Sequence, residues 1–164
     1  MRIEAYAKVN FTLEVFGKRA DGYHALRSLV VPITLSDTLT FVEADEISSD
    51  TGYDDDLCVK AANVLKSYAP NPKSLKGVSI SVEKRIPAGG GLGGGSADAA
   101  ATLVALNEMW GLRFTPERLA EIGAEVGSDV PALVLSRFAG PVVMEGRGEK
   151  VRRLELPPET CFHL

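Results

Sequence analysis

Hydrophobic and polar residues alternate in the N-terminal part of the chain, which is the pattern of half-buried strands. Residues 3–10 show it first, a second apolar run covers residues 12–16, and residues 37–43 alternate again. Between them, the run at residues 26–35 contains Pro32. Because proline cannot donate to a sheet, this run is expected at an edge or a bulge. The pattern therefore predicts four strand segments before any helix.

Helical spacing begins after a polar and acidic stretch, residues 45–54, which we expect to be a surface loop. Carboxylates near Asp55 suit the positive end of a helix dipole, so a helix should start there and end before Pro70. A strand at residues 78–82 follows, and an alanine-rich segment predicts a helix over residues 97–110.

The last third of the chain contains a clear helix start. Thr115 suits the N-cap and Pro116 the first helical position, and this helix should end near Gly127. Three short elements are expected after it: a helix at residues 132–135, a strand at 142–144 and, after a hairpin turn at 145–150, a strand at 151–156.

Composition narrows the functional classes. The chain has 164 residues, the size of one domain, and 45% of them are hydrophobic, enough for a packed core. The net charge of −4 argues against a broad surface for nucleic acid or anionic membranes. With two cysteines and no zinc-ligand spacing, we expect a reducing, cytoplasmic setting. We expect no signal peptide and no membrane span, because long apolar runs are missing.

The most unusual stretch is "PAGGGLGGGSADAAA", residues 87–101. Ordering so many glycines is costly, so they must serve a purpose. Placed between a strand and a helix, their bare amides would form a cradle for phosphates, and Ser96 would be the N-cap or a hydroxyl ligand. The Walker A pattern is excluded for this stretch, because none of its glycines is followed by a lysine. A dinucleotide-binding loop would require a parallel strand directly after the helix, and the pattern predicts a second helix there instead. A flexible linker remains the alternative to a phosphate-binding loop.

Three stretches carry a family resemblance: "AKVNFTLEVFGKRADGYHAL" at residues 7–26, "SVEKRIPAGGGLGGGSADAA" at 81–100, and "GSDVPALV" at 127–134. Together they resemble the GHMP kinases, small-molecule kinases named for galactose, homoserine, mevalonate and phosphomevalonate. The doubled triplet in "GGGLGGGS" is most similar to the branch that acts on a cytidine diphosphate methylerythritol in the non-mevalonate isoprenoid pathway.

The resemblance implies an α+β fold shared with a ribosomal protein, with a mixed or antiparallel sheet and helices packed on one face. It implies ATP and Mg²⁺ as cofactors and transfer of a phosphoryl group to the 2-hydroxyl of the methylerythritol unit. No dedicated metal cage is expected, and Ser96 is the nearest hydroxyl for Mg²⁺. Members have a second domain of similar size, so residues 1–164 are expected to be the N-terminal, ATP-binding domain alone.

Two residues match the family's catalytic positions. Lys8 in "AKVN" would lie on the polar face of the first strand, beside the reacting hydroxyl, where its charge favours an ionised carboxylate. Asp129 in "GSDVP" would take or orient the proton of that hydroxyl. Taken alone, the lysine reads as a solvated side chain and the aspartate as a helix cap.

The nucleotide site is implied by the loop and two flanking residues. Lys84 resembles a family lysine near the adenine, and Asp56 stands in "DDL" where relatives have an asparagine that bonds the base. Asp98 is a second departure, replacing a small or amide residue, and adds negative charge near a triphosphate. The loop residues assigned to the nucleotide are Pro87, Ala88, Gly89, Gly90, Gly91, Leu92, Gly93, Gly94, Gly95, Ser96 and Ala97.

The substrate site is implied around "DGYH", where a turn is expected at residues 21–22. Tyr23 and His24 would hold the cytosine by stacking and hydrogen bonding, and Asn10 would contact the substrate as well. Three alternatives stay open: a turn that binds no ligand, a GHMP kinase for another alcohol such as homoserine or mevalonate, and a non-catalytic nucleotide- or RNA-binding module of the same fold.

Overall fold

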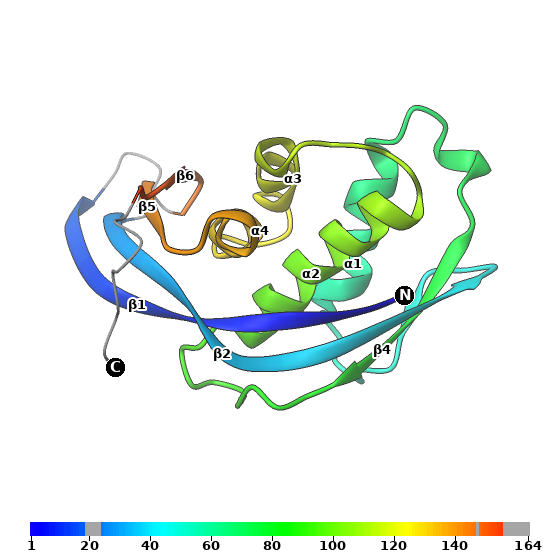
Figure 1. Cartoon of the computed structure of the whole chain (residues 1–164), viewed down its shortest axis with the longest axis horizontal. Coiled ribbons are helices and arrows are strands. Elements are labelled where there is room, and N and C mark those ends of the chain that lie inside the picture. Colours follow the sequence, from blue (N-terminus) through cyan, green and yellow to red (C-terminus); the bar gives the residue numbers. More distant parts are fainter. Residues whose placement is uncertain (19–23, 147, 156–164) are drawn as a thin grey trace.

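The computed structural model describes residues 1–18, 24–146 and 148–155 of the chain. One curved sheet carries the helices on its concave face (Figure 1). The α+β prediction with a mixed sheet is thereby confirmed. In chain order the elements are β1 (Arg2–Lys18), β2 (His24–Ala44), β3 (Ser48–Ser49), α1 (Leu57–Ser67), the 3-10 turn η1 (Pro72–Ser74), β4 (Gly77–Glu83), α2 (Gly94–Met109), α3 (Pro116–Gly123), α4 (Val130–Ala139), β5 (Val142–Gly146) and β6 (Lys150–Arg153).

The strands β1 and β2 are long and antiparallel, and each joins two segments that the sequence pattern had separated. The register between β1 and β2 shifts between Tyr6 and Lys8, and again between Asn10 and Thr12. The two strands stay paired on both sides of each shift. Pro32 lies opposite Lys8 at the first irregularity, so the predicted bulge is confirmed. The prediction of separate strands was wrong because a bulge absorbs the break without ending the strand.

Strand β2 is the centre of the sheet, whose order is β3-β4-β2-β5-β6 with β1 also paired to β2. The C-terminal part of β2 pairs with β4 and its N-terminal part with β5, both antiparallel. Only β3, two residues long, is parallel to its neighbour β4 among the described strands. It lies within residues 45–54, which the sequence had assigned wholly to a loop.

The helices start close to their predicted positions but differ in length. Asp56 caps α1, and Thr115 caps α3 as expected. Helix α2 begins at Gly94 rather than at residue 97, so Ser96 is inside its first turn and is not its N-cap. Helix α3 ends at Gly123 instead of near Gly127, and α4 is longer than the predicted 132–135. Strand β6 covers residues 150–153, so it begins one residue before the predicted strand at 151–156 and ends earlier.

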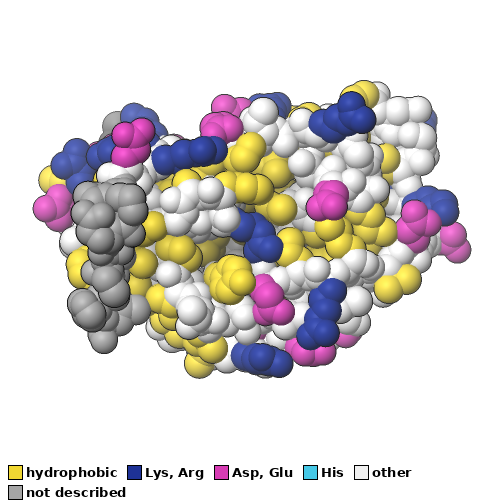
Figure 2. Space-filling model, in the orientation of Figure 1, with side chains coloured by type: hydrophobic (Ala, Val, Ile, Leu, Met, Phe, Trp, Pro, Cys, Tyr) yellow, Lys and Arg dark blue, Asp and Glu magenta, His cyan; other side chains and the backbone are white. Residues whose placement is uncertain are grey.

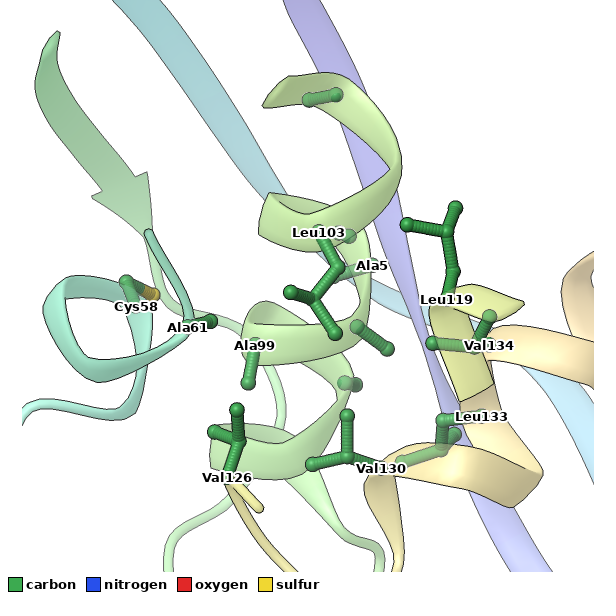
Figure 3. Close-up of a cluster of buried hydrophobic side chains, with 14 of the residues drawn as sticks. Ala5, Cys58, Ala61, Ala99, Leu103, Leu119, Val126, Val130, Leu133 and Val134 are labelled. Atoms are coloured by element: carbon green, nitrogen blue, oxygen red, sulfur yellow. The ribbon is translucent and has the colours of Figure 1, made fainter. Parts of the chain in front are cut away.

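Helix α2 lies in the middle of the core, which explains its alanines. Figure 3 shows side chains of α1 on one side of α2 and those of α3 and α4 on the other. Small side chains let these helices and the sheet approach α2 closely, so residues 97–103 of this helix are all buried. No helix in the described part of the chain has the length and apolar character needed to cross a membrane.

Candidate active site

The glycine-rich loop lies between β4 and the start of α2 (Figure 1) and forms one wall of a cleft of about 390 Å³. The cleft is lined by Thr51, Tyr53, Asp55, Asp56, Leu57, Cys58, Lys84, Ile86, residues 87–96 and Asp98. All but one of the loop residues predicted to bind the nucleotide are therefore brought together. Ala97, the exception, is buried in the first turn of α2.

The loop is held by the sheet at both ends. Near its end, the backbone N–H of Lys8 in β1 donates to the carbonyl of Leu92 at 3.0 Å. At its start, the carboxylate of Asp37 in β2 accepts from the backbone N–H of Arg85 and of Ile86, the latter at 2.8 Å. Asp37 is fully buried. These bonds fix the path of a segment whose glycines would otherwise be free to move.

Asp37 was not among the predicted site residues. The alternation could have indicated it, because Asp37, Leu39 and Phe41 are every second residue of the strand and so lie on the same face. All three are fully or almost fully buried. A carboxylate on the core face of a strand needs donors, and the loop supplies them.

Gly93 is the point where the loop meets β1. Its φ of +71° lies in the left-handed region, as do those of Gly89 and Gly91. A Cβ on Gly93 would lie 3.0 Å from the Cε of Lys8, and one on Gly94 would lie 3.4 Å from the Nζ of Lys84. Two lysines therefore flank the residues at which α2 begins, where backbone N–H groups are unpaired.

Lys8 and Asp129 form an ion pair, with 3.3 Å between Nζ and Oδ2. The prediction that Lys8 lies on the polar face of its strand was wrong: the residue is only 4% exposed. The bulge between Tyr6 and Lys8 changes the phase of the alternation, so Lys8 follows the buried Ala7 into the interior. Asp129 precedes α4 and makes no capping hydrogen bond with its side chain, so the structure does not support the helix-cap alternative.

Lys84 forms ion pairs with two buried carboxylates. Its Nζ lies 2.5 Å from Oδ2 of Asp37 and 2.6 Å from Oδ2 of Asp98. Burial alone would raise the pKa of Asp37, but hydrogen bonds from Arg85, Lys84 and Ile86 outweigh it and hold the pKa below its usual value. Asp98 lacks such donors, and burial raises its pKa to about 7 in spite of Lys84.

Asp56 is occupied as the cap of α1. Its Oδ1 accepts from the backbone N–H of Cys58 at 2.7 Å and of Val59 at 3.2 Å, and its Oδ2 accepts from the Thr51 hydroxyl. Burial would raise its pKa, but these donors together lower it. Burial also raises the pKa of the neighbouring Cys58 thiol to about 12, so this cysteine is unreactive. A contact between Asp56 and a base stays a prediction.

The predicted substrate residues are only partly described. Asn10 is exposed in β1, and its Oδ1 accepts from the Ser28 hydroxyl at 3.1 Å. His24 is the first residue of β2, and Tyr23 with the turn at residues 21–22 lies outside the described residues. Ser96 is half-buried in the cleft wall. Among the described residues, no group of three or more His, Cys, Asp or Glu is placed to hold a metal ion.

Comparison with known proteins agrees with this geometry. Residues 56–137 match the family model described as "GHMP kinases N terminal domain". Proteins of Bacillus cereus and Bacillus anthracis named 4-diphosphocytidyl-2-C-methyl-D-erythritol kinase are 44% identical over 98% of the chain. The chain spans 56% of the length of each.

Solved structures give the same result. A 4-(cytidine 5'-diphospho)-2C-methyl-D-erythritol kinase superposes with a TM-score of 0.79 at 37% identity, over 96% of this chain and 56% of that one. The mevalonate kinase of Methanococcus jannaschii, at 19% identity, a TM-score of 0.68 and coverage of 94% and 56%, shares the fold. The chain belongs to the GHMP kinase family and contains its N-terminal domain.

Proposed function

We propose that the protein transfers a phosphoryl group from ATP to the 2-hydroxyl of 4-diphosphocytidyl-2-C-methyl-D-erythritol, as a cytoplasmic enzyme of isoprenoid precursor synthesis. One observation carries the proposal. The glycine loop and the Lys8–Asp129 pair meet at Gly93, so a phosphate cradle adjoins a buried lysine and a carboxylate. The relatives named above support the choice of substrate.

The cradle suits a polyphosphate. Backbone N–H groups at the start of α2 and in the loop are the donors that phosphate oxygens require, and the helix dipole adds partial positive charge. Mg²⁺ commonly uses few protein oxygens beside phosphates and water, and Ser96 would be one of them. When bound, the ion would neutralise charge on the transferred phosphoryl group.

Lys8 and Asp129 suit the acceptor hydroxyl. The Asp129 carboxylate lies 3.3 Å from the Lys8 ammonium and is positioned to accept a hydrogen bond from an alcohol O–H. An aspartate, with an ordinary pKa near 3.9, is a weak base toward an alcohol. Phosphoryl transfer through a loose transition state needs little early deprotonation, so we assign Asp129 to orientation as much as to proton transfer.

We assign the remaining residues either to the base of the nucleotide or to the cytidine diphosphate substrate. Lys84 and Asp56 line the cleft beside Leu57 and Cys58, a part of the wall that suits a flat base. Asn10 lies in β1, His24 begins β2, the strand paired with β1, and Tyr23 directly precedes His24 in the chain. We propose that these last three contact the cytidine diphosphate substrate.

The test compares acceptors on the full-length protein. ADP formation is measured with Mg·ATP and, in turn, the cytidine diphosphate substrate, homoserine and mevalonate. The proposal expects turnover with the first and background rates with the others. Preference for homoserine or mevalonate would assign the protein to another branch of the family.

An RNA-binding module is the second class to test. Acidic side chains lie among the basic ones on the face shown in Figure 2, and the chain as a whole carries a net charge of −4. We therefore expect no retention of duplex RNA in a filter-binding assay at low salt, where phosphate contacts are strongest. Salt-sensitive binding of RNA, together with no kinase activity, would favour the module.

A further inference from the structure

The side chain of Asp129 has few contacts that fix its direction. Within the described part of the chain, its carboxylate has one ion-pair partner, Lys8 at 3.3 Å, and makes no capping hydrogen bond. The side chain is 31% exposed, so packing restricts it only in part. A carboxylate that must meet an acceptor hydroxyl within hydrogen-bond reach needs a fixed position. That position therefore depends on how the backbone on either side of Asp129 is held.

Ser128, which precedes Asp129, lies against the turn between β5 and β6. A Cβ on Gly148, in that turn, would lie 2.4 Å from the carbonyl oxygen of Ser128 and 3.1 Å from its carbonyl carbon. Gly148 is buried and has a φ of +118°, which residues with a side chain rarely adopt. Because both contacted atoms belong to the backbone, they cannot rotate away as a side chain would. Glycine is therefore needed for the turn to approach Ser128 this closely.

The turn is itself held by the sheet. Residues 142–146 of β5 pair with residues 26–30 of β2, the central strand. Across the turn, the backbone N–H of Gly148 donates to the carbonyl of Glu145 at 3.3 Å. Ser128 thus lies against a segment whose own position is set by strand pairing, so the contact restrains Ser128 and with it the start of α4.

Val130, which follows Asp129, is held by α3. It is fully buried in the first turn of α4, and a Cβ on Gly123, the last residue of α3, would lie 2.8 Å from its Cγ1. Valine is stiff about χ1 and the interior is closely packed, so relief of such a clash would require a shift of its backbone. Both chain neighbours of Asp129 therefore contact a glycine of another element.

We propose that Gly148 and Gly123 are positioning residues for phosphoryl transfer, which hold the backbone on both sides of Asp129 so that its carboxylate meets the acceptor hydroxyl beside Lys8. This inference rests on the role proposed above for Asp129 and gives the β5–β6 turn a part in the reaction. Neither glycine is among the residues that line the cleft of the glycine-rich loop. Displacing Asp129 through them should therefore lower kcat and leave nucleotide affinity unchanged.

The experiment measures kcat, KM for both substrates and the Kd of Mg·ADP on the full-length protein. Gly148→Ala should lower kcat by about 10- to 100-fold, the effect of moving a reacting group by roughly an ångström, with the Kd within about twofold of the wild type. Gly146→Ala is the matched control at the start of the same turn. Gly146 has a φ of +79°, but the three atoms nearest to an added Cβ belong to the carboxylate of Glu149, the flexible end of a side chain. Its kcat should stay within about twofold of the wild type.

Gly123→Ala tests the other side of Asp129 without any change in the turn. It should lower kcat by about tenfold or more, again with the Kd nearly unchanged. In the double variant Gly123→Ala/Val130→Ala the clashing methyl groups are absent, so part of the lost kcat should return. A double variant as slow as Gly123→Ala would contradict the contact through Val130.

An Asp129→Ala background separates positioning from damage to the fold. Without a carboxylate to misplace, Gly148→Ala and Gly123→Ala should each change the residual kcat by less than about twofold. A loss of folded enzyme would instead lower kcat by the same factor in both backgrounds, and the stoichiometry of Mg·ADP binding measures the folded fraction.

Two results would overturn the inference and leave the proposed function standing. One is a kcat that neither substitution lowers, and the other is a kcat lowered equally with and without the Asp129 carboxylate. Absence of turnover by the wild type with every acceptor would overturn both the inference and the proposed function.

Discussion

The ion pair between Lys8 and Asp129 joins the first strand to the start of the fourth helix, at the edge of the glycine-rich loop. Asp129 stands at the N-cap of α4 but its side chain makes no capping hydrogen bond, so replacing it by asparagine should leave α4 in place. We predict that Asp129→Asn lowers kcat by about 10²–10⁴-fold, the usual contribution of a proton-transfer group, with nucleotide affinity nearly unchanged. Steady-state kinetics with ADP titration measures both. Activity within twofold of the wild type would contradict the assigned role.

Asp98 also makes stability depend on pH. Its pKa is about 7 in the folded protein and near 3.9 when unfolded, so the folded state holds more protons between these values. The free energy of unfolding should therefore fall as pH rises from about 4 to about 7, and level off above. We predict that Asp98→Asn gains about 1–4 kcal/mol over the wild type on going from pH 5 to pH 8. Urea unfolding at both pH values measures this, and a pH-independent difference would refute it.

Within the glycine loop, Gly93 combines a left-handed φ with close contact to Lys8. Alanine there is strained by about 1–2 kcal/mol and must displace the lysine as well. We predict that Gly93→Ala weakens Mg·ADP binding by about tenfold or more and lowers kcat. Gly111→Ala is the matched control, because Gly111 has φ +63° with no atom within 4 Å of an added Cβ. It should lower stability by about 1 kcal/mol and leave binding unchanged.

The start of the loop depends on Asp37. Removing its carboxylate leaves the N–H groups of Arg85 and Ile86 without an acceptor. We predict that Asp37→Ala lowers the free energy of unfolding by about 2–4 kcal/mol, the cost of two unsatisfied donors. Asp37→Asn keeps an acceptor oxygen and should lose less. If both variants unfolded at the same denaturant concentration as the wild type, the loop would not depend on this anchor.

The starts of helices and the position of a bulge were predictable where a single residue or a short run of like residues determines them. The carboxylates near Asp55 and the Thr115 cap marked helix starts correctly, and Pro32 marked a bulge. The continuity of β1 and β2 was not predictable, because pairing with a neighbour decides whether a bulged strand continues. The early start of α2 was missed for a similar reason: glycines are poor helix formers, yet Gly94 and Gly95 lie in its first turn.

Across the whole chain, the sequence indicated candidate residues for a site but not how they meet. Resemblance placed Lys8, Lys84 and Asp129 in it, although they are far apart in the chain. Only the folded sheet showed that Lys8 is buried against Asp129 and that Lys84 is held by two carboxylates. Local pattern carries no information on such pairs, because they depend on which strand lies beside which.

The last prediction concerns the 164-residue chain by itself. It contains the glycine loop and the Lys8–Asp129 pair, so we expect it to bind Mg·ADP weakly. It spans 56% of the length of its relatives, and β1 exposes a row of apolar side chains at Phe11, Leu13 and Val15, which are 45%, 54% and 63% exposed. Such a row on a strand usually contacts another surface, which we expect to include part of the substrate wall.

We therefore predict that turnover by residues 1–164 alone is below detection, whereas the full-length protein is active under the same conditions. Parallel ADP-release assays and calorimetry on the two proteins separate binding from turnover. Turnover by the shorter chain at the full-length rate would mean that residues 1–164 already form the complete site. Loss of both binding and turnover, with a cooperative unfolding transition retained, would mean that the cradle itself depends on the rest of the protein.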